Sequence, residues 1–487
     1  MKKYAILLII VTFVSGIFVN PALAQGPTGS WVSGITCQNL SDVLANVTFY
    51  FYRTGENVAA LTYSDTIPGN GTLKYFTPNT PAGLPSSFLG SATVASSEQL
   101  LCNVNTQSAG AGTTTAPYRI GTSLGFISSQ VGPVMYVPQI TKAGTWNTYI
   151  AIQNTTGQSV DIKVQYYDRN TGSEIVNAVE NRTIAGNSSL MVYPESNVNL
   201  PATFYGSAKI SSINPASTPL AAIVNFHNIG SDYTTSQLQS YNAFASGANS
   251  LYAPRVVRKY YGYNSGVSIQ NISGVATTLQ IEMSFADGSK IAYTTPSINP
   301  NASYIAYLPS ITELNPVDAK PMTQRYASVK VTANNASATI VGITNIDNRG
   351  LASDNGGTPV PLENIGKGAS ANMALGGTAT QTVFFSQVAR KTSGFSGGII
   401  IANSEASAGT CDISFSGVPA ATLNDVELPD QGQISFFLGT YSSLPVGFNA
   451  SVKAVCTKAV YGTYNFSIEP GYGKYGDSYI EANGFNQ

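Results

Sequence analysis

The nine residues "WNTYIAIQN" at Trp146–Asn154 have three close counterparts elsewhere in this chain. The counterparts are "WVSGITCQN" at Trp31–Asn39, "YNSGVSIQN" at Tyr263–Asn271 and "FSGGIIIAN" at Phe395–Asn403, so successive copies begin 115, 117 and 132 residues apart. Their even positions are apolar or small and their odd positions are mostly polar or tolerant, which is the period of a half-buried β-strand. The chain therefore contains four copies of one predicted β-strand.

Each copy begins with an aromatic residue and has Asn eight positions later: Trp31, Trp146, Tyr263 and Phe395, then Asn39, Asn154, Asn271 and Asn403. We expect the aromatic to plug the sandwich near the edge of a sheet, positions four and six after it to enter the core, and the Gln-Asn pair to leave the core. Asn tolerates left-handed backbone and bonds its own main chain, so it suits the end of a strand. We interpret the four Asn residues as structural. The alternative is four identical ligand sites.

A second block recurs in the same order after the first. "LPSSFLGSATV" from Leu84, "LPATFYGSAKI" from Leu200 and "LPVGFNASVKA" from Leu444 align without gaps, and "MTQRYASVKV" from Met322 matches them with one residue deleted. Two motifs that recur together four times indicate internal repetition.

Each repeat holds roughly seven short strands in about 115 residues, with turn signals between them, as in an antiparallel sandwich of immunoglobulin-like size. Propeller blades run about 40 to 50 residues, which is less than half of this period. The predicted fold class is all-β: four tandem immunoglobulin-like antiparallel β-sandwich domains after a signal peptide. The predicted boundaries are 1–24 for the signal, then 25–125, 126–247, 248–376 and 377–487. With short linkers between them, the four sandwiches would form a rod of about 150 Å.

The first residues read as an export signal. Lys2 and Lys3 supply the positive start, an apolar run follows, and "ALA" at 22–24 has the small-x-small form of a cleavage site. Cleavage there would leave Gln25 first. The competing interpretation is an uncleaved membrane anchor, but the run is somewhat short and is broken by Ser15 and Gly16. We expect an extracellular or cell-surface location and no membrane insertion after cleavage.

Charge is scarce in this chain. Charged residues make up 10% of it and the formal net charge is −1, against about 25% charged residues in ordinary soluble domains. A nucleic-acid-binding protein would show a basic face, and none is visible in the sequence. Weak net charge also removes a repulsion that keeps proteins apart, which favours self-association.

The chain has four cysteines, Cys37 and Cys102 in the first repeat and Cys411 and Cys456 in the fourth. An even count in an exported chain predicts disulfides, with three possible connectivities. The simplest connectivity pairs the cysteines within each repeat, as Cys37–Cys102 and Cys411–Cys456. It would place one stabilising disulfide in the core of each end module. The spacing and the single histidine do not fit a zinc site.

The motifs "WNTYIAIQN", "LPATFYGSAKI", "PLAAIVN" and "SYNAFASG" resemble those of tandem immunoglobulin-like repeat proteins exported by filamentous bacteria. The resemblance covers nearly all of the mature chain and is clearest in residues 134–271. It implies a secreted or surface location and immunoglobulin-like folds, and it brings no active site. The fourth repeat departs most, since Ala402 stands where the other copies have Gln.

Candidate sites for chemistry are few. The only histidine, His227, lies on a late strand of the second repeat, and the carboxylates Asp168, Glu174 and Asp287 lie in predicted turns. We therefore predict no catalysis and no cofactor. The loop "DNRGLASDNGG" is the richest cluster of oxygen ligands and is the candidate site for a weakly bound calcium ion. Its candidate ligands are Asp347, Asn348, Asp354 and Asn355.

These observations predict a structural or adhesive protein of the cell surface, such as a component of an envelope layer, sheath, filament or stalk. Its expected partners are further copies of itself or other envelope components. The tail "SYIEANGFNQ" raises two alternatives, since it could complete the last sandwich or pair with another molecule. The alternative function is binding of extracellular polysaccharide, with exposed tyrosines such as Tyr260 and Tyr261 stacking on sugars.

Overall fold

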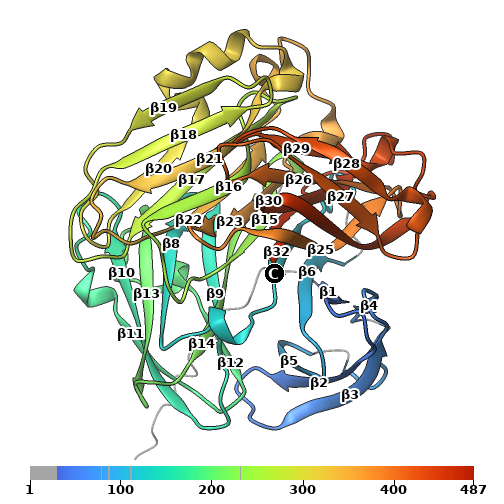
Figure 1. Cartoon of the computed structure of the whole chain (residues 1–487). Coiled ribbons are helices and arrows are strands. Elements are labelled where there is room, and N and C mark those ends of the chain that lie inside the picture. The colour runs from blue at the N-terminus through green and yellow to red at the C-terminus, as the bar shows by residue number, and fades with distance from the viewer. Residues whose placement is uncertain (1–29, 78, 86–87, 110–111, 231) are drawn as a thin grey trace, which may run out of the picture.

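Antiparallel β-strands make up most of the chain (Figure 1). The computed structural model describes residues 30–77, 79–85, 88–109, 112–230 and 232–487, so the expected signal peptide lies outside the described residues. The strands form two sheets in each of the first three modules and, in the fourth, two layers connected through the shared strand β30, which confirms the all-β sandwich class. The segments in which apolar and polar residues alternate in the sequence therefore form β-strands in the fold.

Module 1 is built from strands β1 to β7. One sheet has the order β4-β1-β6-β7 and the other has the order β3-β2-β5. The bounds are β1 Trp31–Asn39, β2 Ala45–Arg53, β3 Ala59–Ile67, β4 Thr72–Phe76, β5 Gly90–Ser96, β6 Leu100–Ser108 and β7 Ile120–Leu124.

Module 2 adds one strand to this plan. Its sheets have the orders β11-β10-β13-β8 and β12-β9-β14-β15. The bounds are β8 Val134–Lys142, β9 Trp146–Asn154, β10 Val160–Asp168, β11 Glu180–Ile184, β12 Ser189–Val192, β13 Phe204–Asn214, β14 Leu220–Ile229 and β15 Ser236–Asn242. The additional strand is β8, which precedes the recurring nonapeptide.

Module 3 repeats the plan of module 2. Its sheets have the orders β19-β18-β21-β16-β24 and β20-β17-β22-β23. The bounds are β16 Ser250–Val257, β17 Tyr263–Asn271, β18 Leu279–Phe285, β19 Lys290–Thr294, β20 Ser303–Tyr307, β21 Tyr326–Ala333, β22 Ile340–Asn348, β23 Gly368–Asn372 and β24 Ala374–Leu375.

In module 4 one long strand, β30, serves both sheets. Its first part pairs with β25 and β27, and its last part pairs with β26 and β31. The bounds are β25 Thr380–Arg390, β26 Phe395–Asn403, β27 Gly409–Phe415, β28 Leu423–Leu428, β29 Gln433–Phe437, β30 Phe448–Ile468, β31 Tyr479–Asn483 and β32 Phe485–Asn486. The tail pairs within its own chain, because Phe485 and Asn486 lie opposite Phe384 and Val383 of β25. It thus completes the fourth sandwich.

Helical structure among the described residues is limited to short 3₁₀ segments, and none of these is long and apolar enough to cross a bilayer. Most of them connect strands. They are η1 Ser128–Gln130, η2 Val176–Ala178, η3 Pro194–Ser196, η4 Tyr233–Thr235, η5 Leu308–Ser310, η6 Thr312–Ala319, η7 Met322–Gln324, η8 Ala352–Asn355, η9 Leu362–Asn364, η10 Pro419–Ala421 and η11 Leu438–Thr440.

The recurring nonapeptide places its apolar positions in each core, as its alternation predicts. Ile150, Ile152, Val267 and Ile269 are fully buried. Each such side chain contributes about 1.5 to 3 kcal/mol by leaving water. The Gln-Asn pair that follows, however, does not leave the interior: Gln270 is 0% exposed. This expectation was wrong because the turns and the neighbouring modules cover the sheet face that an isolated sandwich would show to water.

The four modules close into a ring, so the expected rod is wrong. In Figure 1 the red strands of module 4 lie beside the blue strands of module 1, although the two modules are at opposite ends of the chain. The Tyr118 amide of module 1 donates to the Tyr475 carbonyl of module 4 at 2.8 Å, and the Asp477 amide donates back to the Tyr118 carbonyl at 2.8 Å. The linkers turn the chain back on itself because the modules offer complementary polar faces, which the repeat pattern does not reveal.

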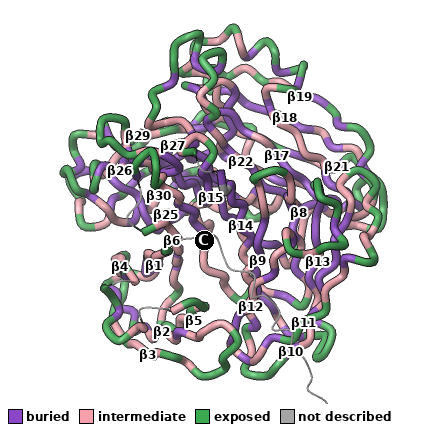
Figure 2. The backbone as a smooth tube through the Cα atoms, turned by 180° about the vertical axis from the view of Figure 1, so that it is seen from behind, coloured by how far each residue is buried: buried purple, intermediate pink, exposed green. Residues whose placement is uncertain are grey.

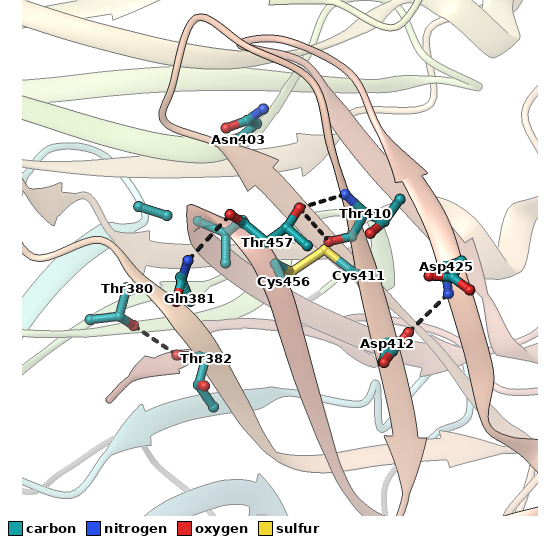
Figure 3. The surroundings of a disulfide bond; sticks show 12 residues. Thr380, Gln381, Thr382, Asn403, Thr410, Cys411, Asp412, Asp425, Cys456 and Thr457 are labelled. Carbon is teal, nitrogen blue, oxygen red and sulfur yellow. Dashed lines mark hydrogen bonds between the residues drawn. A yellow bond between two sulfur atoms is a disulfide. The ribbon is translucent and has the colours of Figure 1, made fainter.

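Both disulfides join neighbouring strands of one sheet. Cys37 of β1 is bonded to Cys102 of β6, and Cys411 of β27 is bonded to Cys456 of β30. Figure 3 shows the second bond beside Thr457, whose hydroxyl accepts from the Thr410 amide at 2.9 Å. Each bond closes a long loop within one module, which reduces the freedom of the unfolded chain.

Candidate functional site

The four modules meet along one set of strands, which we call the axial strands: β7, β15, β23 and β31. Each is the last full strand of its module and pairs with the long strand before it. Figure 2 shows that buried backbone is concentrated around β15 and β22, near the middle of the molecule, whereas β2, β3 and β5 of module 1 are largely intermediate or exposed.

A series of equivalent amide bonds links the axial strands. The Asn242 side chain of β15 donates to the Leu124 carbonyl of β7 at 2.9 Å. Asn372 of β23 donates in the same way to the Asn242 carbonyl at 2.6 Å, and Asn483 of β31 donates to the Asn372 carbonyl at 2.8 Å. Each of modules 2, 3 and 4 is therefore bonded to the module before it through the same position.

One buried carboxylate, Asp477, joins three of the four modules. Its oxygens accept from the amides of Leu238 in module 2 at 3.0 Å and of Gly368 in module 3 at 2.9 Å. The amide of Tyr479, in its own module, donates to it at 3.2 Å. Asp477 is 0% exposed, and this burial raises its pKa well above the usual range, against the opposing effect of the amides and of Lys367.

Lys367 is the buried cation of this centre. It is 1% exposed, and its Nζ donates to the Ile468 carbonyl of module 4 at 2.6 Å and to Asn364 Oδ1 at 2.9 Å. Burial lowers its pKa to about 8, although Asp477, Glu363 and Glu469 act in the opposite direction. A lysine with a depressed pKa inside a module junction makes the stability of the ring dependent on pH.

We expect that dependence to lie on the alkaline side. In the unfolded chain Lys367 keeps its proton to about pH 10.5, whereas in the fold it loses the proton near pH 8. Between these values the unfolded state binds more protons, so stability rises with pH. From pH 7.5 to 10 the parent should gain roughly 1 to 3 kcal/mol relative to Lys367→Met, as measured by denaturant unfolding. Parallel pH profiles for the two proteins would contradict this expectation.

A second junction position recurs on the first strand of three modules. Gln139 of β8 accepts at Oε1 from Ser268 at 2.5 Å and from Asn345 at 3.1 Å, both in module 3. Gln387 of β25 accepts at Oε1 from Asn105 of module 1 at 3.0 Å. The side chain in this position therefore reaches from one module into the next around the ring.

In module 3 the same position is Arg255 of β16. Its guanidinium donates to the Tyr479 hydroxyl at 2.7 Å and to Glu481 Oε2 at 3.1 Å, both in module 4. The junctions from module 2 to 3, 3 to 4 and 4 to 1 are thus bridged from the same position, by an accepting Gln in two cases and a donating Arg in the third. Reading the sequence did not single out these residues, although the recurrence of Asn105, Asn225, Asn345 and Asn465, one per late strand, was the available signal.

The Asn that ends each nonapeptide bonds the turn after it. The Asn154 amide donates to the Gln158 and Ala185 carbonyls at 2.6 and 3.2 Å, and its Oδ1 accepts from the Thr156 amide at 3.0 Å. Asn39, Asn271 and Asn403 make equivalent bonds. With these bonds made inside the fold, the side chains hold the turn rather than face a ligand.

The aromatic residues that head the nonapeptides are half-buried and are not brought together. Trp146 packs on the core of module 2. Tyr263 lies 5.7 Å from the Tyr479 ring, and Phe395 lies 6.4 Å from the Tyr118 ring, both across module junctions. Trp31 is likewise half-buried at the start of β1.

The four candidate calcium ligands are held by their own neighbours. Asp347 pairs with Arg349 at 2.7 Å, and Asp354 accepts from the Asn264 amide at 2.7 Å. Asn348 accepts from the Gly350 amide and Asn355 donates to the Thr358 carbonyl, each at 3.0 Å. Across the described ranges no group of three or more His, Cys, Asp or Glu residues is placed to hold a metal ion.

The residues considered for catalysis each bond to neighbours of their own module. Glu174, which lies in the same turn as Asp168, accepts from Gln165 at 2.8 Å. The His227 ring packs against the Tyr149 ring at 5.5 Å with an interplanar angle of 60°, and His227 Nε2 lies 3.5 Å from Glu195 Oε2. Asp168 closes its own turn by accepting from the Thr171 amide, while Asp287 pairs with Lys320 and its pKa is held at about 2. These contacts are those of structural polar residues.

The two tyrosines considered for sugar stacking do not form a flat platform. The rings of Tyr260 and Tyr261 are perpendicular, at an interplanar angle of 90°. Tyr260 packs against Tyr326, and only Tyr261, at 41%, is well exposed.

The sequence matches no family model and no curated protein. Among solved structures, a Thermotoga maritima protein is similar over 26% of this chain and 95% of its own, at 13% identity and a TM-score of 0.19. A tetra-tandem repeat from the extending region of a large adhesion protein is similar over 96% and 97% of the two chains, at 11% identity and a TM-score of 0.11. The PBSX exported protein XepA is similar over 44% and 81%, at 7% identity and a TM-score of 0.13. Scores this low carry no argument about function.

Proposed function

We propose that this chain is an exported structural or adhesive protein, a rigid four-module building block of a cell-envelope layer, sheath, filament or stalk, and that it works without catalysis. The observation that carries the proposal is the ring closure itself. Side chains at the same first-strand position cross three junctions, where Gln139 and Gln387 accept hydrogen bonds and Arg255 donates them. Modules held together in this manner do not move relative to one another. The surfaces of the protein therefore keep a fixed geometry, which an ordered assembly requires of its components.

The two disulfides and the expected export signal support an extracellular location, since disulfides form and persist in oxidising compartments. The low charge of the chain supports association with further copies or with other envelope components. Several buried polar side chains at the centre of the molecule, Asp477, Lys367 and Gln139 among them, are bonded across module junctions.

Negative-stain imaging of the purified mature chain and of cells that produce it tests this function. Ordered two-dimensional arrays or fibres that grow with protein concentration are expected, because low net charge leaves little repulsion between copies. The matched control is the same chain carrying several exposed Ser→Glu changes far from the junctions, which should fold normally and assemble less. A chain that stays monomeric at high concentration and fails to bind cells would overturn the proposal.

Polysaccharide binding remains the alternative, and it is distinguished by a glycan array. Binding that is lost in Tyr261→Ala, without any change in assembly, would favour that function over a scaffold.

A further inference from the structure

Module 1 is the only module in which the described residues include no strand ahead of the recurring nonapeptide. In modules 2, 3 and 4 that first strand, β8, β16 or β25, pairs along β13, β21 or β30. The counterpart of β13, β21 and β30 in module 1 is β5, and β5 pairs with β2 alone. One whole edge of β5 is therefore open among the described residues.

The first strands of the other modules share a pattern of inward residues. Each places three apolar side chains in its core with the spacing Φ-x-Φ-x-x-Φ, where Φ is apolar, and with Gln or Arg just before the third. The inward residues are Met135, Val137 and Ile140; Leu251, Ala253 and Val256; and Val383, Phe385 and Val388, all at most 3% exposed.

Among the described residues, the β5 side of the module 1 core is less covered than the same side of module 2, although Phe49 and Phe51 are buried. Ala92 of β5 is exposed, whereas Ala208, its counterpart in module 2, is 0% exposed. Val94 is half-buried, whereas its counterpart Ile210 is 0% exposed. Cys102 is also half-buried, although its disulfide partner Cys37 is 1% exposed.

The contact that a first-strand Gln or Arg makes at the other three junctions has no counterpart between modules 1 and 2 among the described residues. Other side chains do bond across that junction, as Gln153 does to Thr93 of β5 at 3.2 Å. Asn105 and Asn345 each donate to the Gln of the preceding module's first strand. Asn225, the equivalent residue of module 2, accepts at Oδ1 from Ser240 of its own module at 2.6 Å, and Ser240 lies beside Gly121 of module 1. A strand added to β5 would carry its Gln or Arg to this junction, so the open edge continues an established interface.

We propose that β5 receives a strand from another polypeptide, which completes module 1 and the junction between modules 1 and 2. The occupant is an extended segment with the pattern Φ-x-Φ-x-[Gln/Arg]-Φ, held by main-chain hydrogen bonds to β5 and by its three apolar side chains in the core. The proposal deepens the scaffold function, on which it rests for the place of the partner in the envelope. Strand addition at β5 would be the contact through which this chain attaches to its partner in the envelope.

Peptide binding tests strand addition at β5 separately from assembly. A fluorescent peptide with the sequence of residues 134–142, "VMYVPQITK", carries the required pattern. It should bind the exported, purified chain with saturable 1:1 stoichiometry, as measured by anisotropy at protein concentrations too low for assembly. The control peptide carries M135S, V137S and I140S and should bind at least tenfold more weakly.

Two matched variants of the chain locate the site. Ala92→Asp changes an exposed residue on the core-facing side of β5 and should weaken peptide binding at least tenfold. Ala95→Asp changes an exposed residue on the opposite side of the same strand and should leave binding within twofold of the parent. Equal effects of the two variants would overturn the assignment to β5.

A self-complemented chain keeps the proposal testable if a variant folds poorly. Residues 133–145 placed directly before Trp31 should raise the melting temperature and abolish binding of the peptide. Failure of the exported parent chain to bind the peptide would overturn the proposal. In that case, N-terminal sequencing that finds residues upstream of Gln25 retained would identify the chain's own leader as the occupant.

Discussion

X-ray scattering from the mature chain is expected to give a radius of gyration of about 23 Å, the value for one compact body of its length. A rod of four sandwiches about 150 Å long would give about 43 Å, its length divided by the square root of twelve. The difference is nearly twofold. The physical cause is the junction between modules 4 and 1, where Tyr118 exchanges backbone hydrogen bonds with Tyr475 and Asp477.

Gly476 offers a way to open that junction. Its φ is +88°, and a Cβ added there would lie 2.6 Å from the Tyr118 carbonyl oxygen and 2.7 Å from Pro117 Cβ. Gly476→Ala should therefore separate modules 1 and 4 and raise the radius of gyration. The control is Gly471→Ala, which has a similar φ of +96° but no atom within 4 Å of the added Cβ. A parent radius above about 35 Å would contradict ring closure.

Replacement of Asp477 by Ala should cost roughly 3 kcal/mol of folding stability, because the buried amides of Leu238 and Gly368 lose their acceptor. Unfolding by denaturant measures the loss. Asp477→Asn keeps the size of the side chain but turns an NH₂ group toward one of the two donors. We expect that variant to lose about half as much.

Asp430→Ala is the matched control, since Asp430 is exposed in the same module. Its effect should stay within about 0.5 kcal/mol. If Asp477→Ala were equally silent, the carboxylate would not be what joins the three modules.

The sequence alone determined the inside of each module. Alternation within "WNTYIAIQN" predicts which residues enter a core, because the side chains of a strand point to opposite faces whatever surrounds them. Pairing of cysteines within a repeat follows from the same local reasoning, and Cys37 and Cys102 do face each other on adjacent strands.

Only the tertiary structure decided how the modules meet. Gln139 and Gln387 are ordinary polar residues in sequence, and their bonds depend on which face of another module lies opposite them. The same holds for the burial of Gln270 and for the edge of β5 that no described strand pairs with. Repeats report what each unit must bury for itself, whereas the arrangement of the units depends on contacts between residues a hundred or more positions apart.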